Sequence, residues 1–275
     1  MDGKKIAEEK MLLLKEEIKR EGASLSLAVV QVGDNPVSGI YVRNKKEKLE
    51  SIGITVNLYK LREDISVEEL KEKIAFLKEG GVIIQLPLPK HIDKNEVIEI
   101  ILPEKDVDLL SPYSFINFFN KEAKIFPPVV SAVFLLLKEY NIEVEGKDVV
   151  LIGAGDLVGK PLSLFFINKK ATVSVLNRET KDKSFFTKNA DIIVSGVGVP
   201  SIVKKEDIKK GVVLIDAGTS SSSGNLVGDI DIEEVKSKAS FLAPVPGGVG
   251  PLTIYYLAYN LFYLRDKKTE YGNGN

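Results

Sequence analysis

The fold of this chain is decided by residues 149–161, which read Val149-Val150-Leu151-Ile152-Gly153-Ala154-Gly155-Asp156-Leu157-Val158-Gly159-Lys160-Pro161. Four apolar residues run directly into a glycine-rich turn, and we expect an apolar helix and a further strand to follow. Strand, turn and helix in this order direct backbone N–H groups and the positive end of the helix toward a phosphate. The glycine spacing is one residue longer than the usual G-x-G-x-x-G. It is therefore the surrounding strand–helix–strand pattern that favours a nucleotide-binding turn over a purely structural one.

Helical and strand-like segments alternate on both sides of this turn. Strands are expected at 148–152, 171–176, 191–195 and 212–216 in the second half, and at 26–32, 55–60 and 81–86 in the first. Helices are expected at 4–20, 38–51, 66–78 and 95–101, and an apolar helix through Leu137 follows Pro127-Pro128. Ser66 and Glu69 form a capping box at the start of the third helix. The alternation predicts an α/β fold with two lobes flanking a cleft, an N-terminal α/β catalytic lobe and a Rossmann-like dinucleotide-binding lobe.

The composition is that of an ordinary globular protein, with 275 residues, 44% of them hydrophobic, and a formal net charge of −1. That balance shows no basic footprint for nucleic acid or for an anionic membrane surface. No apolar run approaches the roughly 20 residues that span a bilayer. Residues 1–20 mix Lys and Glu like an amphipathic helix and unlike a signal peptide. We therefore expect a cytoplasmic protein with neither nucleic-acid nor membrane partners.

Two residue types that support much catalysis are scarce or missing. The chain has no cysteine, which excludes disulfides, thiolate nucleophiles and cysteine-based metal or iron–sulfur sites. Its single histidine, His91, lies in an expected surface loop, which argues against a histidine zinc site or a Ser-His-Asp triad. We expect no metal site, and acid–base chemistry must fall to Lys, Tyr, Asp or Glu.

Lys45 is the one charge in an apolar stripe. At about 100° per helical residue, Tyr41, Lys45, Leu49 and Ile52 share one face of the helix expected at 38–51. Burial lowers the pKa of a lysine toward a value that is useful for proton transfer near neutrality. The alternative is that Lys45 extends along its own stem to water, as most lysines do. Tyr41, one turn earlier, either stacks on a flat ring or fills the core.

Polar groups also follow expected strands. Gln85 closes the apolar run 82–84 just before Leu86-Pro87-Leu88-Pro89, and Asp106 and Asp108 lie in Lys105-Asp106-Val107-Asp108. In open α/β sheets, ligands gather at the carboxyl ends of strands. Taken alone, each group would be interpreted as a solvated loop residue.

A second glycine-rich run reads Ala243-Pro244-Val245-Pro246-Gly247-Gly248-Val249-Gly250-Pro251-Leu252-Thr253. Its prolines lack a backbone donor and its glycines tolerate positive φ, so it can be neither helix interior nor central strand. It can bring bare backbone close to a ligand, with Gly250 as N-cap and Pro251 at the first position of the last helix. The alternative is a rigid turn without a ligand.

The choice between NADP and NAD rests on Arg178. The second strand of the dinucleotide-binding half ends in Leu176-Asn177-Arg178, where a preference for NAD would place Asp or Glu. Arg178 can pair with a 2′-phosphate, although Glu179 follows immediately. The residues favour NADP, and NAD remains possible.

Six motifs occur together along the chain: Tyr41-x-x-x-Lys45, Gln85-Leu-Pro-Leu-Pro89, Lys105-Asp-Val-Asp108, Gly153 through Pro161, Val227-Gly-Asp229, and Pro244 through Thr253. In this order they resemble the bifunctional methylenetetrahydrofolate dehydrogenase/methenyltetrahydrofolate cyclohydrolase family over nearly the whole length. The resemblance implies hydride transfer from 5,10-methylenetetrahydrofolate to NADP. Water then opens the 5,10-methenyl cation to 10-formyltetrahydrofolate. It also implies a place in one-carbon metabolism and purine biosynthesis.

The resemblance further implies a role for each matching residue. Lys45 is the central acid–base lysine, Gln85 hydrogen-bonds to it and tunes its pKa, Tyr41 stacks beside the folate, and Asp108 accepts from the pterin N–H groups. Pro246 and Gly247 line the folate side of the cleft, with Gly250 and Thr253 on the nicotinamide side. The residues assigned to the cofactor are Gly153, Gly155, Asp156, Arg178, Gly198, Thr219, Gly250 and Thr253.

Three segments depart from the family pattern. Leu109 follows Asp108 where the family has glycine, which alters how the aspartate is presented. Pro127-Pro128-Val129-Val130 stands where Pro-Cys-Thr-Pro is common, and Ala154 with Gly155 replaces an Arg-Ser pair that serves the cofactor. These changes bear on cofactor preference and catalytic rate more than on fold.

The expected domains are residues 1–120 with the C-terminal helix 252–275, which bind folate, and residues 121–251, which bind NADP. Members of the family are commonly homodimers, so we expect a homodimer. Two other functions fit the same residues: a small-molecule NAD(P)-dependent dehydrogenase that uses Lys45 as its base, as shikimate-type enzymes use a lysine, and a member that binds folate or nucleotide without turnover.

Overall fold

The computed structural model describes residues 1–222 and 225–265 and divides the chain into two compact units. The three-stranded unit comprises Glu9–Pro127 and Ile254–Asn275, and the five-stranded unit comprises Met1–Glu8 and Pro128–Thr253. The chain passes between them within helix α1 (Gly3–Arg20), after Pro127, and within helix α10 (Val249–Leu264). The last part of the C-terminal helix expected from the sequence, 266–275, lies outside the described residues.

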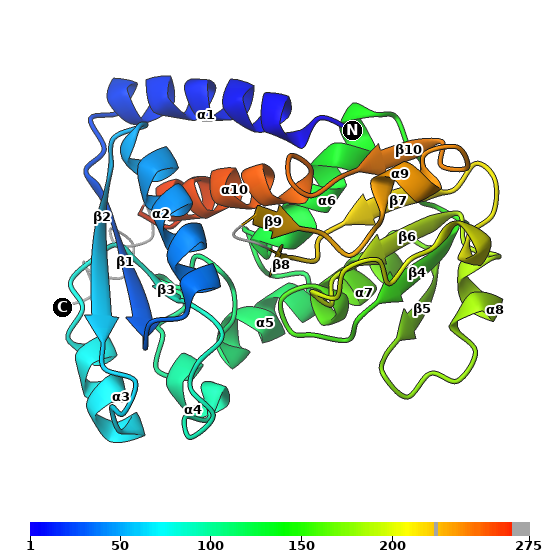
Figure 1. Cartoon of the computed structure of the whole chain (residues 1–275). Helices are drawn as coiled ribbons and strands as arrows, with labels where there is room; N and C mark the ends of the chain where they lie inside the picture. Colours follow the sequence, from blue (N-terminus) through cyan, green and yellow to red (C-terminus); the bar gives the residue numbers. More distant parts are fainter. Residues whose placement is uncertain (223–224, 266–275) are drawn as a thin grey trace. The chain divides into compact units, whose positions relative to one another are not determined.

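The three-stranded unit is built on a parallel sheet with the order β2-β1-β3 (Figure 1). Its strands are β1 (Leu25–Val32), β2 (Ile54–Leu61) and β3 (Gly81–Ile84). Its helices are α2 (Pro36–Glu50), α3 (Val67–Ala75), α4 (Lys94–Ile98) and α5 (Pro112–Phe119). A parallel bridge between Val82 and Asp106 brings the segment 105–108 alongside β3. The parallel arrangement places the ends of β1 and β3 at one edge of the sheet, with Asp108 close to that region.

Both faces of this sheet are covered. On one face, Val30 and Ile84 pack in a buried cluster with Leu70 of α3 and Val97 of α4. On the other face, a Cβ on Gly81 would lie 2.9 Å from a side-chain carbon of Leu261, so α10 packs directly on the strand. The buried amide of Asn260 donates to the carbonyls of Val107 and Phe126 at 2.9 and 3.0 Å and fastens α10 to this unit. A parallel sheet with both faces buried needs apolar strands, and β1 and β3 are buried almost throughout.

The five-stranded unit contains a parallel sheet with the order β10-β7-β6-β4-β5 (Figure 1). Its strands are β4 (Asp148–Ile152), β5 (Thr172–Leu176), β6 (Ile192–Ser195), β7 (Val213–Asp216) and β10 (Phe241–Ala243). The other elements are α6 (Pro128–Glu139), α7 (Gly159–Asn168), α8 (Lys183–Thr187), α9 (Ile232–Val235), the short 3-10 helix η1 (Lys205–Asp207) and a hairpin of β8 (Ser220–Ser222) and β9 (Asn225–Val227). The chain leaves β4 for β5 on one side and later returns to β6 on the other. The strand order therefore reverses at β4, and ligands of such sheets bind outside the carboxyl ends at this switch point.

The α/β class with parallel sheets is confirmed, and the expected strands and helices are present with ends shifted by a few residues. Ser66 is the N-cap of α3, since its hydroxyl accepts from the N–H of Glu69 at 3.1 Å. The expected strand 81–86 ends at Ile84, two residues before Leu86-Pro87, where proline removes a backbone donor. The elements α5, α8, α9, the β8–β9 hairpin and β10 were not among those expected, because they are too short for periodicity to define.

Candidate functional site

Lys45 projects from α2 and is partly buried. Its Nζ donates to Oε1 of Gln85 over 3.4 Å. The Gln85 amide is itself held in place, because its Nε2 donates to the carbonyl of Leu86 at 2.8 Å and its backbone N–H donates to Val30 at 2.8 Å. The segment that follows β3 therefore fixes an amide oxygen in front of the lysine.

Asp108 completes this group from the segment beside β3. Burial lowers the pKa of Lys45 below its ordinary value, and the negative charge of Asp108 acts against that shift. Burial also raises the pKa of Asp108 to about 6, which the Lys45 charge lowers and the charge of Asp106 raises. An amine that loses its proton easily thus lies within electrostatic range of a carboxyl group that gains one easily. This pairing suits transfer of protons near neutrality.

The turn that carries Asp108 is anchored by Asp106. Its buried carboxylate accepts from the N–H of Leu110 at 3.1 Å and from the N–H of Ser111 at 2.8 Å. Leu109 lies between these residues with a φ of +53°. Positive φ is a conformation that glycine adopts freely and a leucine does not. The departure at Leu109 therefore leaves the turn intact and adds backbone strain to it.

Tyr41 lies one turn before Lys45 on α2 and is partly buried, like the lysine. The predicted stripe is confirmed in part, since Leu49 and Ile52 are buried while Arg43 and Glu47 are exposed. The structure brings together three of the predicted residues, Lys45, Gln85 and Asp108. Tyr41 shares the helix face of Lys45.

The three glycines of the turn at 153–159 differ in how closely other atoms surround them. Gly153 has a φ of +110°, and a Cβ there would lie 2.8 Å from a side-chain carbon of Val197. A Cβ on Gly159 would lie 1.9 Å from the carbonyl oxygen of Gly153, so the start of α7 packs on the turn itself. Gly155 is exposed, and nothing lies within 4 Å of where its Cβ would be. The turn is thus closely packed at Gly153 and Gly159 and open at Gly155. A phosphate can approach the backbone at the open side.

Two further loops at the carboxyl edge of the sheet border this turn. Gly198, after β6, has a φ of +70°, and a Cβ there would lie 3.0 Å from the carbonyl oxygen of Thr219, after β7. The backbone N–H of Gly153 donates to Leu176 at 2.8 Å and thereby ties the turn to the end of β5. Arg178 follows two residues later with an exposed side chain. The glycine turn thus borders the loop after β6 at Val197, this loop contacts the loop after β7 at Thr219, and Arg178 follows the end of β5.

Asp156 forms an ion pair with Lys160, with 2.6 Å between Oδ1 and Nζ. Both side chains are exposed at the start of α7. The carboxylate offsets the positive charge that Lys160 adds to the positive end of the helix. Asp156 therefore lies at the turn, and its carboxylate is engaged by Lys160.

The run 243–253 forms a compact turn in the five-stranded unit. The N–H of Gly248 donates to Pro244 at 2.7 Å, the peptide between Val245 and Pro246 is cis, and the backbone of Gly247 has a φ of +103°. Pro246 and Gly250 are exposed. The prediction of Gly250 as N-cap and Pro251 as first helical residue is wrong, because α10 begins at Val249. Pro251 still lies in the first turn, where its missing N–H has no intrahelical partner to lose.

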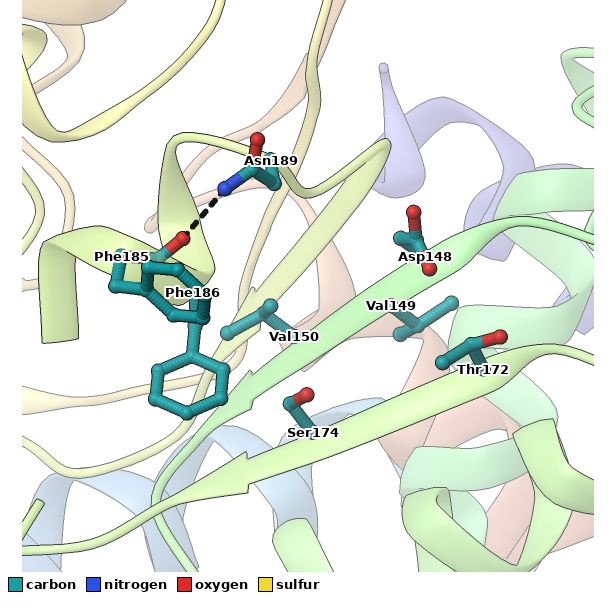
Figure 2. Close-up of a pocket in the computed structure, with 8 residues that line it drawn as sticks. All are labelled: Asp148, Val149, Val150, Thr172, Ser174, Phe185, Phe186 and Asn189. Atoms are coloured by element: carbon teal, nitrogen blue, oxygen red, sulfur yellow. Dashed lines mark hydrogen bonds between the residues drawn. The ribbon is translucent and has the colours of Figure 1, made fainter.

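A separate hollow of about 260 Å³ lies in the five-stranded unit, on β4, β5 and α8 (Figure 2). It is lined by Asp148, Val149, Val150, Thr172, Ser174, Phe185, Phe186 and Asn189. Asp148 and Thr172 begin their strands, so this hollow reaches the edge of the sheet opposite the glycine turn. None of the residues predicted to form the site lines it.

Two aspartates for which no role was predicted, Asp216 and Asp229, are completely buried. Each stands within two residues of a glycine, in Asp216-Ala217-Gly218 and Gly228-Asp229, and that pairing was the available signal. Among residues 1–222 and 225–265, no cluster of three His, Asp or Glu side chains is arranged to hold a metal ion. No helix in the described part of the chain is long and apolar enough to cross a membrane.

Comparison with known proteins shows the family of this chain. The family model for the catalytic domain of tetrahydrofolate dehydrogenase/cyclohydrolase matches residues 1–108, and the model for its NAD(P)-binding domain matches residues 127–269. A protein of Aquifex aeolicus named bifunctional protein FolD is 44% identical over 273 residues, which cover 94% of this chain and 92% of the relative.

Solved structures match nearly the whole chain. The bifunctional FolD enzyme of Campylobacter jejuni matches with a TM-score of 0.90 and 39% identity, covering 97% of this chain and 98% of that one. The Trypanosoma brucei methylenetetrahydrofolate dehydrogenase-cyclohydrolase, solved with NADP cofactor and an inhibitor, matches with a TM-score of 0.91 and 33% identity, covering 98% and 97%. These matches confirm the resemblance inferred from the motifs.

Proposed function

Because the chain belongs to the tetrahydrofolate dehydrogenase/cyclohydrolase family, we propose that it oxidises 5,10-methylenetetrahydrofolate with NADP and hydrolyses the product to 10-formyltetrahydrofolate. One observation supports the assignment of the chemistry most strongly. Lys45, with its pKa lowered by burial, donates to the fixed amide oxygen of Gln85 and interacts with Asp108. A second function is not favoured by any observation at this site.

Lys45 is the proposed acid–base residue of the hydrolytic step. Water adds to the methenyl carbon, and the neutral amine of Lys45 accepts the proton that the water loses. The bond between this carbon and the pterin nitrogen N5 then breaks, and N5 takes the second proton, which leaves the formyl group on N10. Burial lowers the pKa of the amine and therefore raises the fraction that is unprotonated and able to act as base.

Gln85, Tyr41 and Asp108 prepare this step. Gln85 holds the Lys45 amine through its oriented amide. Asp108 accepts from the pterin N–H groups when it is ionised, and its pKa of about 6 leaves it mostly ionised at neutral pH. Tyr41 stacks beside the folate from the preceding turn of α2. Pro246 and Gly247 are proposed as further substrate contacts, since their turn exposes backbone.

The cofactor site is proposed at the carboxyl edge of the five-stranded sheet. Bound NADP would take a hydride from the methylene carbon of the substrate. Its pyrophosphate fits the open side of the glycine turn, because the position of a Cβ on Gly155 is empty while Gly153 and Gly159 are closely packed. Arg178 is the proposed partner of the 2′-phosphate. The remaining proposed contacts are Asp156, Gly198, Thr219, Gly250 and Thr253.

Folate binding and NADP binding are assigned to different domains. We propose that residues 1–120 and the C-terminal helix bind folate, and that residues 121–251 bind NADP. We further propose that the protein acts in the cytoplasm and that its formyl product serves purine biosynthesis. A homodimer is supported by β2, an edge strand of eight residues on which Leu58 and Tyr59 are exposed. Sedimentation at micromolar concentration measures its mass, and a monomer would contradict this part of the proposal.

Initial rates with 5,10-methylenetetrahydrofolate and either NADP or NAD test the dehydrogenase, and detection of 10-formyltetrahydrofolate tests the hydrolysis. Reduced cofactor with formyl product, and a higher rate with NADP, is the expected result. Folded protein that binds folate without turnover would contradict the proposal.

Lys45→Met tests the proposed base. Methionine fills a similar volume without the ammonium, so we expect hydrolysis of methenyltetrahydrofolate to fall by at least roughly 100-fold while the fold is kept. Lys46→Met is the matched control, because Lys46 pairs with Glu50 at 3.1 Å on the same helix and is not part of the site. Equal hydrolysis by the Lys45 variant and the control would remove the role assigned to Lys45.

A further inference from the structure

The β6 loop, residues 196–199, is held from behind by an aspartate about 30 residues away in sequence. Asp229 is fully buried and lies two residues after the end of β9. Its Oδ2 accepts from the hydroxyl of Ser195 at 2.7 Å and from the N–H of Val197 at 2.8 Å, and its Oδ1 accepts from the N–H of Val199 at 2.9 Å. Both amides that flank Gly198 therefore end on one carboxylate.

The same carboxylate lies against the β7 loop, residues 217–219. A Cβ on Gly218 would lie 2.0 Å from the carboxyl carbon of Asp229, so only glycine fits there. Gly198 in turn packs on the carbonyl of Thr219, from which its Cβ would lie 3.0 Å away. Asp229 thus fills the space behind both loops that carry proposed cofactor contacts.

A second buried carboxylate secures the first. Asp216 accepts from the N–H of Gly218 at 3.0 Å and from the N–H of Ile230 at 2.9 Å. A Cβ on Gly228 would lie 2.1 Å from its Oδ2. Asp216 therefore fixes the residues on either side of Asp229, while Asp229 itself accepts from the β6 loop.

The inward direction of these amides leaves the valine side chains outside. Val197 is 38% exposed and Val199 is 50% exposed, although both are apolar. Val197 also borders the glycine turn, since its side chain would meet a Cβ on Gly153 at 2.8 Å. The loop consequently presents an apolar edge beside the open backbone of the turn, and such an edge suits the flat ring of a dinucleotide.

We propose that Asp229 is a positioning residue for the nicotinamide dinucleotide, which holds the β6 and β7 loops in the shape that the cofactor contacts. The inference rests on the proposed cofactor site and adds a residue that does not touch the cofactor. Asn in place of Asp229 keeps the volume but replaces one acceptor oxygen by an NH₂ group, so that in either orientation of the amide a loop N–H, that of Val197 or that of Val199, faces a donor. A buried donor without an acceptor favours a rearranged loop, and binding must then restore its shape.

The test compares Asp229→Asn with Ser195→Ala in two assays. Asp229→Asn is expected to raise the KM for NADP about tenfold. Hydrolysis of methenyltetrahydrofolate without NADP should stay within about twofold of wild type, because Lys45, Gln85 and Asp108 lie in the other unit. Ser195→Ala removes one donor and leaves both loop amides on the carboxylate, so its KM for NADP should change by less than about twofold. An unchanged KM in Asp229→Asn, or an equal loss in both assays, would overturn the proposal.

A measurement on the wild-type protein does not depend on the variant folding. In the absence of NADP, hydrogen exchange at the amides of Val197 and Val199 should be as slow as at the strand amides of β6. Exchange as fast as in an exposed loop would overturn the proposal. If the wild type reduces no NADP, the proposed function fails, while this measurement still decides whether Asp229 fixes the loop.

Discussion

Lys45 and Lys46 are neighbours on one helix, and their different surroundings separate a candidate catalytic group from a surface group. Lys46 donates to the carbonyl of Val56 at 3.0 Å and pairs with Glu50. Lys45 points along the apolar stripe to Gln85, where burial lowers its pKa. The helical period alone predicted this difference, because positions 41, 45, 49 and 52 share one face. The acceptor in front of the lysine had to come from another part of the chain.

Leu109 has a φ of +53°, and this positive φ predicts that glycine at position 109 gives a more stable protein than alanine, the reverse of their usual order. Leu109→Gly and Leu109→Ala both lose the buried side chain, and only glycine also relieves the positive φ. Leu109→Gly should therefore be more stable than Leu109→Ala by roughly 0.5–1 kcal/mol. Elsewhere in a helix or strand the order is reversed. Urea unfolding of both variants measures the difference, and an alanine variant at least as stable as the glycine variant would show that the turn is unstrained.

Arg178 predicts the cofactor preference. Arg178→Ala should raise the KM for NADP by roughly 10- to 100-fold, since a charge-assisted contact with the 2′-phosphate is lost. The KM for NAD should stay nearly constant, because NAD lacks that phosphate. Lys181→Ala, the loss of another exposed cation three residues away, controls for a general effect of charge. If Arg178→Ala weakens both cofactors equally, the argument for NADP from this residue fails.

At the scale of elements, the glycine turn predicts two different effects of adding one methyl group. Gly159→Ala places a Cβ against the carbonyl of Gly153, so it should destabilise the protein by about 2 kcal/mol. Gly155→Ala meets only open space, so the melting temperature should not change. Its KM for NADP should nevertheless rise several-fold, because the methyl group occupies the path of the pyrophosphate. Thermal melts and initial rates on both variants measure these effects, and a Gly155 variant with normal KM would move the pyrophosphate elsewhere.

Long apolar strands and amphipathic helices were predictable at this scale, and short elements were not. The strand β4 and its glycine turn combine a continuous apolar run with a sharp breaker, so their type and position follow from local residues. Helix α5 has Ser111 as N-cap and Pro112 inside its first turn, yet it has only eight residues, and three of its apolar residues, Tyr113, Ile116 and Phe119, are exposed. A pattern that short does not separate a helix from a loop.

At the scale of the whole molecule, Asp216 contributes a pH dependence to stability. Burial raises its pKa to about 6 in the folded chain from an ordinary value of 3.8. The folded state therefore binds this proton more tightly than the unfolded state. The resulting stabilisation is complete below the unfolded pKa and is lost as the pH rises through about 6. Relative to Asp216→Asn, which cannot titrate, the wild type should lose about 2 kcal/mol of stability between roughly pH 4.5 and pH 7.

Urea unfolding of the wild type and of Asp216→Asn at both pH values measures this change as a difference, so that groups common to both proteins cancel. A difference that does not vary with pH would mean that Asp216 titrates normally in the folded chain.

The sequence by itself determined the α/β class, the glycine turn, the lysine stripe and the family, because each depends on residues that are close in sequence and follow a period or a motif. Tertiary structure alone decided that Gln85 faces Lys45, that Asp106 presents Asp108, and that Asp229 holds the β6 loop. These contacts join residues on different strands and loops, and they form only when the parallel sheets align the ends of their strands. The burial that shifts the pKa values of Lys45 and Asp108 also depends on the tertiary structure. Desolvation is set by the packed structure around a group and not by its neighbours in the chain.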